Sequence, residues 1–114
     1  MASGKYGDSV WELDDLGLKL KIADFACKPD LVKWSQTAER DIACDSEMTR
    51  IGVLEAVIDH IGNGYVINCD FMKNGDLAYI LNCFVGRHRR YIKLRFAMFG
   101  DIEHMYIFSA HPNR

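Results

Sequence analysis

A cluster of basic side chains near the C-terminal end of the sequence could hold a polyanion. Its members are Arg87, His88, Arg89, Arg90, Lys93 and Arg95. Guanidinium forks match phosphate oxygens, and several such contacts supply much of the affinity of a protein for nucleic acid. The row of Tyr91, Lys93 and Arg95 also combines an aromatic ring with cations, as RNA-binding sheets often do. The cluster therefore predicts phosphate contact, with a solvated hairpin turn as the plainer alternative.

The last histidine, His111, could act as a general acid or base because a histidine ordinarily titrates near neutrality. Strict alternation over residues 105–111 predicts that His111 shares a strand face with Ile107 and that Tyr106 faces the other way. An exposed polar strand end is the alternative interpretation. The other histidines are expected to be ordinary surface residues: His60, His88 and His104.

The sequence offers little for other kinds of catalysis. It contains no Ser-His-Asp or Cys-His signature and no glycine-rich phosphate loop. Its four histidines share no spacing typical of a metal centre, so neither a metal nor another cofactor is expected. What remains is RNA cleavage in which a 2′-hydroxyl attacks its own phosphate. Cations would stabilise the pentacoordinate state, and a His, Tyr or Lys would move protons.

Charge is unevenly distributed along the chain. The net charge is −2, but residues 1–70 carry 13 acidic and 7 basic side chains, whereas residues 71–114 carry 3 acidic and 7 basic ones. The C-terminal part could therefore bind a polyanion or an acidic protein partner. An apolar content of 49% is ample for one core. We expect a single domain over residues 1–114, with flexibility expected within residues 1–12.

Targeting and redox features favour a cytoplasmic protein. No apolar run approaches the ~20 residues of a membrane span, and no basic start precedes an apolar stretch, so neither a membrane segment nor a signal peptide is predicted. The cysteines lie at wide intervals without a CxxC pair: Cys27, Cys44, Cys69 and Cys83. We expect buried, reduced thiols rather than disulfides or zinc ligands.

The first half of the chain predicts short helices. Residues 9–26 fit a strand and a helix about equally well. Residues 35–43 predict a helix with Ser35 as its N-cap. The clearest helix is expected over 51–61, where apolar residues recur at three- and four-residue steps, after a cap in the segment 44–47.

The second half predicts strands, because its apolar period changes to two. Four strands are expected: 65–71, 77–85, 91–99 and 105–111. Asn74-Gly75 predicts a two-residue hairpin turn, and turns are also expected at 86–90 and 100–104. The order indicates an α+β fold, with N-terminal short helices packed on one face of a four-stranded antiparallel sheet. The other face would show Lys93 and Arg95.

Several segments resemble the RelE/MqsR-like superfamily of small toxins. They are "VKWSQTAERDI" (32–42), "RIGVLEAVIDHIGNGYVI" (50–67), "YIKLRF" (91–96) and "MYIFSAHP" (105–112), and the similarity spans residues 31–112. The resemblance implies a metal-independent ribonuclease from a bacterial or phage toxin–antitoxin pair. Its partners would be RNA or the ribosome, together with a cognate antitoxin.

The resemblance also implies roles for individual residues. Catalytic roles fall on His111, Arg95 and Tyr106. RNA contacts fall on Arg40 and Lys93, and the basic cluster itself predicts further nucleic-acid contacts at Arg87, Arg89, Arg90 and Tyr91. One departure matters, because related proteins often carry a histidine where this chain has Thr37. If that histidine is catalytic, this chain could have kept binding and lost activity.

Two other interpretations stay open. The first is a non-enzymatic protein-binding module, such as a phage inhibitor, an immunity-type protein or an adaptor, which acts by stoichiometric complex formation. The acidic N-terminal half and Thr37 favour it. The second is a structural subunit that forms a homodimer through the edge of its sheet.

Overall fold

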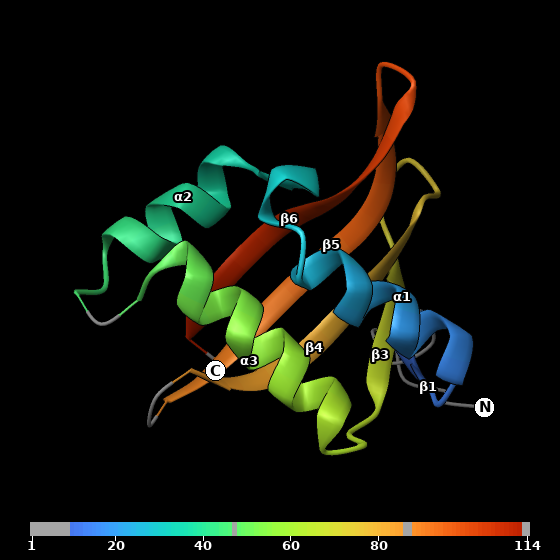
Figure 1. Cartoon of the computed structure of the whole chain (residues 1–114), viewed down its shortest axis with the longest axis horizontal. Coiled ribbons are helices and arrows are strands. Elements are labelled where there is room, and N and C mark those ends of the chain that lie inside the picture. Colours follow the sequence, from blue (N-terminus) through green and yellow to red (C-terminus); the bar gives the residue numbers. More distant parts are fainter. Residues whose placement is uncertain (1–9, 47, 86–87, 113–114) are drawn as a thin grey trace.

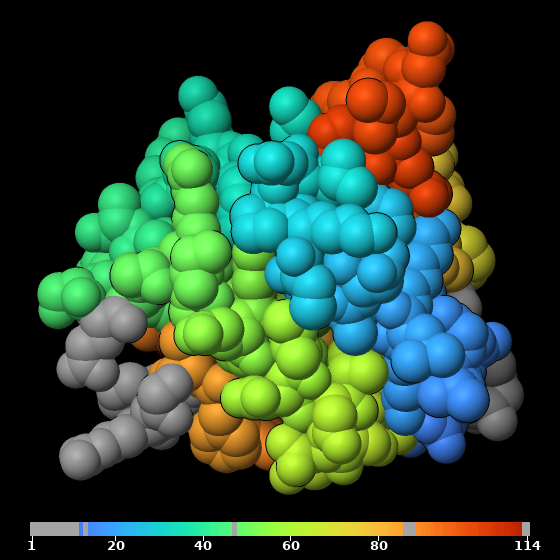
Figure 2. All heavy atoms as spheres, viewed as in Figure 1, coloured from blue at the N-terminus to red at the C-terminus, as the bar shows by residue number. Residues whose placement is uncertain are grey.

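The described part of the chain folds into two layers, with three α-helices on one face of a sheet (Figure 1). The computed structural model describes residues 10–46, 48–85 and 88–112. In chain order the elements are β1 (Val10–Leu13), α1 (Leu16–Ala26), the 3-10 turn η2 (Pro29–Leu31), β2 (Val32–Trp34), α2 (Gln36–Ala43), α3 (Arg50–Gly62), β3 (Ile67–Phe71), β4 (Leu77–Val85), β5 (His88–Phe99) and β6 (Ile102–Pro112). The α+β class is as expected, and Figure 2 shows the helices covering most of the sheet on this side.

The sheet is larger than predicted and is mixed. Its order is β1-β3-β4-β5-β6-β2, and all pairs are antiparallel except β2–β6, which is parallel. The expectation of four antiparallel strands is therefore wrong. The two additional strands have four and three residues, too few to show an apolar alternation in the sequence. The turn expected at 86–90 is also corrected, because β5 begins at His88.

The helices are held by side-chain caps. Asp15, Ser35 and Thr49 each accept a backbone N–H from the first turn of α1, α2 and α3. The cap at Ser35 confirms the prediction, whereas the cap of α3 lies at Thr49 and not within 44–47. Residues 16–26 are helical, but α1 is turned so that Leu16 and Leu20 are exposed while Ile22 and Ala26 are buried.

The core lies between the helices and the sheet. From α3 it takes Val53 and Val57, and from the central strands it takes Leu81, Ile92, Leu94 and Ile107. The predicted alternation of β5 is confirmed, since Ile92 and Leu94 point to the helices. We call the opposite surface of the sheet the open face.

A bulge in β6 changes which side chains share the open face. Lys93 pairs with Ser109 but Leu94 pairs with Ile107, so Phe108 is the extra residue. Ile107 and Ala110 are both buried against the helix layer. The alternation is therefore shifted at Phe108, and Tyr106 and His111 fall on the same face. The prediction that they face opposite ways is wrong for this reason.

Side chains of α2 bind the outer edge of β6 where β2 ends. The Ser35 hydroxyl donates to the Phe108 carbonyl oxygen at 2.7 Å. The Asp41 carboxylate accepts the Ala110 N–H at 2.9 Å. These contacts satisfy backbone groups beside the bulge, so α2 stabilises the shifted register.

Candidate functional site

The open face brings several of the predicted site residues together on two neighbouring strands. Tyr91 lies opposite His111, Lys93 opposite Ser109, and Arg95 opposite Tyr106. The Phe108 ring joins this row, 5.6 Å from the Arg95 guanidinium and 4.7 Å from the Tyr106 ring. All three described helices pack on the other side of the sheet (Figure 1). We give the name aromatic row to the group Tyr91, Lys93, Arg95, Tyr106, Phe108, Ser109 and His111.

The Tyr91 and His111 rings stack. Their centroids are 4.7 Å apart and their planes differ by 8°. His111 Nδ1 lies 2.7 Å from the Pro112 carbonyl oxygen, which can only accept, so the proton lies on Nδ1. The neutral ring then presents Nε2 as its basic nitrogen. Burial, with a smaller contribution from Asp70, raises the pKa of Tyr91, so this phenol stays protonated near neutrality.

The cations of the aromatic row are neutralised by nearby acids. Lys93 Nζ lies 3.8 Å from an Asp70 carboxylate oxygen, and Arg95 Nη1 lies 3.1 Å from one of Asp76. The Lys93 and Arg95 side chains are 21% and 28% exposed. To reach Asp70, Lys93 must cross β4 beside its register partner Ile80, which is only 4% exposed. The strongly positive surface expected from the sequence is therefore weakened here.

Arg89 and Arg90 point to opposite sides of β5. Arg89 is exposed on the open face, with its guanidinium 5.1 Å from the Phe84 ring. Arg90 is 4% exposed and forms an ion pair with Asp45 in the loop after α2. The prediction that Arg90 contacts nucleic acid does not fit this position, because period-two alternation turns its side chain into the helix layer.

The remaining predicted contacts do not join the aromatic row. Arg40 is exposed on α2, in the helix layer. Arg87 lies outside the described residues, as does the side chain of His88. Within the row, Arg95 and His111 are also separated, because four residues of strand rise from Tyr91 to Arg95 span roughly 13 Å. Lys93 lies between them, so it is the cation nearer to His111.

A cavity of about 570 Å³ lies at the C-terminal end of α3. It is lined by Ala56, Asp59, His60, Asn63, Gly64, Tyr65, Val66, Asn68, Asn82, Phe84 and Arg89. Its lining mixes amides, aromatic rings, one guanidinium and one imidazole, a combination typical of small-molecule sites.

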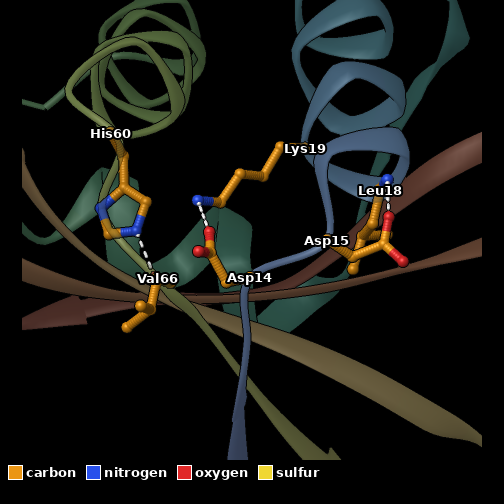
Figure 3. Close-up of polar contacts among 6 residues, drawn as sticks. All are labelled: Asp14, Asp15, Leu18, Lys19, His60 and Val66. Carbon is orange, nitrogen blue, oxygen red and sulfur yellow. Dashed lines mark hydrogen bonds and ion pairs between the residues drawn. The ribbon is translucent and has the colours of Figure 1, made fainter.

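The imidazole of His60 is the most unusual group in this cavity. It is 6% exposed, and its Nε2 donates to the Val66 carbonyl oxygen at 2.8 Å (Figure 3). Its Nδ1 is buried without a hydrogen-bond partner among the described residues. Burial lowers the pKa of His60 below 6.5, and the cations of Lys19 and Arg89 lower it further, while the bond to Val66 acts the other way. A neutral ring with an unmatched acceptor results, at a cost of about 1–3 kcal/mol.

Helix α1 also contributes a polar group beside His60. Lys19 is buried and pairs with Asp14, and Figure 3 shows this pair beside the His60 ring. The Nδ1 side of the ring faces away from Lys19 in this view. Sequence reasoning missed His60 as a site residue. The available signal was its spacing from Val53 and Val57, both buried on the same side of α3.

His104 and the cysteines also differ from expectation. His104 is buried, and one of its ring nitrogens lies 3.0 Å from the Ile102 carbonyl oxygen. All four cysteines are free thiols, but Cys27 and Cys44 are exposed. Burial raises the pKa of Cys69 to about 11 and that of Cys83 to about 12, so these two thiols stay protonated.

Among the described side chains, no group of three or more His, Cys, Asp or Glu is arranged to hold a metal ion. No described helix is both long and apolar enough to cross a membrane.

Comparison of the chain with protein-family models, with curated proteins and with solved structures finds no match. The resemblance to RelE/MqsR-like toxins therefore stays a prediction.

Proposed function

We propose that the open face of the sheet binds single-stranded RNA. The observation that carries this proposal is the aromatic row, in which the stacked Tyr91 and His111 rings, Tyr106 and Phe108 lie beside Lys93 and Arg95. Bases stack on such rings, with a contribution of about 1–3 kcal/mol per base. A strand of RNA lying along β5 and β6 would place its bases on the rings and its phosphates near the cations.

The ion pairs of Lys93 and Arg95 do not prevent phosphate contact. Both pairs are partly exposed, and such pairs contribute only about 0–1 kcal/mol. A phosphate can therefore replace a carboxylate at small cost. Stacking supplies most of the affinity in this arrangement, so the salt dependence of binding should be shallow.

RNA cleavage is the catalytic form of the same proposal. His111 Nε2 would take the proton of a 2′-hydroxyl, whose oxygen attacks the adjacent phosphorus while the bond to the 5′-oxygen breaks. The departing 5′-oxygen would take a proton from water and leave as the 5′-hydroxyl of the next nucleotide, and the phosphorus would remain in a 2′,3′-cyclic phosphate. Lys93 is the cation nearest to His111 and would stabilise the extra charge. Tyr106 and Arg95 lie further along the row, where they would hold the following nucleotide. The spacing supports binding more directly than cleavage.

Fluorescence anisotropy with a labelled single-stranded RNA tests the proposal. We expect Tyr91→Ala to weaken binding about tenfold, as loss of one stacked base implies. Phe71→Ala is the matched control, since it removes an exposed ring from the other side of β3. Equal affinities for Tyr91→Ala and the wild type would refute binding on this face.

Cleavage is tested with total RNA and with translating ribosomes, in the presence of a chelator. Wild type should give products with 2′,3′-cyclic phosphate ends, and the double variant Arg95→Ala, His111→Ala should give none. The same bands from both proteins would exclude cleavage at this site.

A second candidate function, binding of a protein partner, is favoured by one observation. The end of the β5–β6 hairpin projects beyond the helices (Figures 1 and 2) and exposes Met98, Phe99 and Ile102. An antitoxin or another partner could cover this apolar end. Pull-down with the wild type and with Met98→Ser, Ile102→Ser tests it, since a stoichiometric partner should be lost only from the double variant.

A further inference from the structure

The cavity at the end of α3 occupies a notch in the sheet. β3 begins at Ile67 and pairs with β4 up to Ile80, whereas β4 continues to Val85. Asn82 and Phe84 lie on this overhanging end of β4 and line the cavity, together with Asn68 of β3. The notch therefore opens from the helix layer toward the open face.

His60 provides the inner end of the cavity with a directional group. Because its Nε2 donates to Val66, its buried Nδ1 can only accept, and no described group donates to it. This nitrogen is buried, so a ligand N–H reaches it only if the His60 ring shifts toward the cavity, and it would then satisfy a nitrogen that is otherwise unmatched. The edge of a nucleobase carries such N–H groups beside acceptors, and the Asn68 side chain can donate and accept in return.

Two exposed aromatic rings, Tyr65 and Phe84, line the same cavity. The Tyr65 ring lies 5.4 Å from the His60 ring, on the loop between α3 and β3. Flat, partly exposed rings beside hydrogen-bonding amides suit a planar heterocycle better than an aliphatic ligand. The volume of about 570 Å³ is in the range for a drug-sized ligand.

Arg89 supplies a positive charge at this cavity. Its guanidinium packs on Phe84 and belongs to the open face as well as to the cavity lining. Of the charged residues lining the cavity, Arg89 is the cation and Asp59 the acid. An arginine fork is suited to bidentate contact with a phosphate. The lining therefore combines groups for a base with a group for a phosphate.

We infer that this cavity binds one nucleoside monophosphate, with its base toward His60 and Asn68 and its phosphate on Arg89. The nucleotide is either free or the end of an RNA chain, and both offer the same chemistry. The inference stands on the cavity alone and does not require RNA binding by the aromatic row.

Calorimetric titration of the full chain with the four ribonucleoside 5′-monophosphates tests the inference. At least one should bind, and Asn68→Ala and Arg89→Gln should each weaken it about tenfold. Lys33→Gln is the matched control, because it removes one exposed positive charge from β2 on the far edge of the sheet. The ¹⁵N resonance of His60 Nδ1 should shift on binding, which a nucleotide held elsewhere would not produce.

The possible outcomes separate this site from the aromatic row. Tyr91→Ala should keep the mononucleotide even if it loses RNA, and Asn68→Ala should lose the mononucleotide even if RNA binding by the row fails. Displacement of the mononucleotide by a 5′-phosphorylated oligonucleotide supports a site for an RNA end, and its persistence supports a site for a free nucleotide. No binding, equal binding of ribose 5-phosphate, or full affinity in both cavity variants overturns the inference.

Discussion

Arg89 and Arg90 are neighbours in the sequence but belong to different environments. Arg89 is exposed on the open face beside Phe84, whereas Arg90 is buried in the helix layer and paired with Asp45. The same division continues along β5, where Tyr91, Lys93 and Arg95 line the open face and Ile92 and Leu94 enter the core. One strand thus contributes to the core on one side and to the proposed RNA-binding surface on the other.

The role of a charged side chain in this segment depends on the face of β5 from which it projects. A buried arginine with a carboxylate partner is costly to leave unpaired, so Arg90 acts on stability. A partly exposed cation can exchange its carboxylate for a phosphate at little cost, so Lys93 and Arg95 can act on binding.

The largest effect should follow from removing the buried arginine. Arg90→Met removes a buried guanidinium and breaks its ion pair with Asp45, and we expect a loss of about 3–5 kcal/mol in the free energy of unfolding. Arg89→Met, the adjacent control, should change it by no more than about 0.5 kcal/mol. Urea denaturation measures both, and equal midpoints for the two variants would contradict the division between the faces.

A smaller loss is expected where α2 holds the edge of β6. Asp41→Ala leaves the Ala110 N–H without its acceptor and should cost about 1–3 kcal/mol. Asp24→Ala is the control, since among the described residues Asp24 pairs with the exposed Lys28 four residues later. Hydrogen exchange gives a local readout, because the Ala110 amide should lose protection. Unchanged protection there would show that α2 does not stabilise the shifted end of β6.

The sequence predicted those features that depend on neighbouring residues. The continuous apolar run of residues 77–85 and the alternation of residues 91–96 were sufficient to predict β4 and the two faces of β5. Ser35 was recognised as a cap because a hydroxyl before a helix has a local partner. These patterns depend on residues that are close in the chain, so a single sequence is enough to recognise them.

The features that the sequence did not predict depend on contacts between residues that are distant in the chain. The bulge at Phe108 appears only when β6 is aligned with β5, and it decides that Tyr106 and His111 share a face. Asp45 and Arg90 lie far apart in the chain, so no local pattern marks their ion pair. The cavity needs β3 to begin where β4 continues, which is a matter of register. The candidate site was therefore predicted in its residue types and only partly in its geometry.

A change in binding should follow when an open-face cation is released. Asp76→Asn frees Arg95 from its ion pair, and we expect a two- to fivefold gain in RNA affinity, corresponding to about 0.5–1 kcal/mol. The salt slope should steepen by about 0.7, as one further phosphate contact on a single strand implies. Glu39→Gln is the matched control, because it frees Arg50 on the helix side. An equal gain from both variants would mean that net charge, and not the open face, governs binding.

The smallest effect is the pH dependence that the buried His60 gives to stability. Burial lowers the pKa of His60 below its ordinary value of 6.5, so the fold favours the neutral ring. The unfolded chain then binds more protons than the fold in the window below pH 6.5, and the free energy of unfolding must decrease as the pH falls through it. The decrease ends below the lowered pKa, where both states are protonated. Urea midpoints measured between pH 7.5 and 5.5 should show this slope in the wild type, a weaker one in Arg89→Gln, and the weakest in His60→Gln. Parallel curves for all three proteins would mean that His60 is not held neutral, and that the acceptor assigned to its Nδ1 is not present.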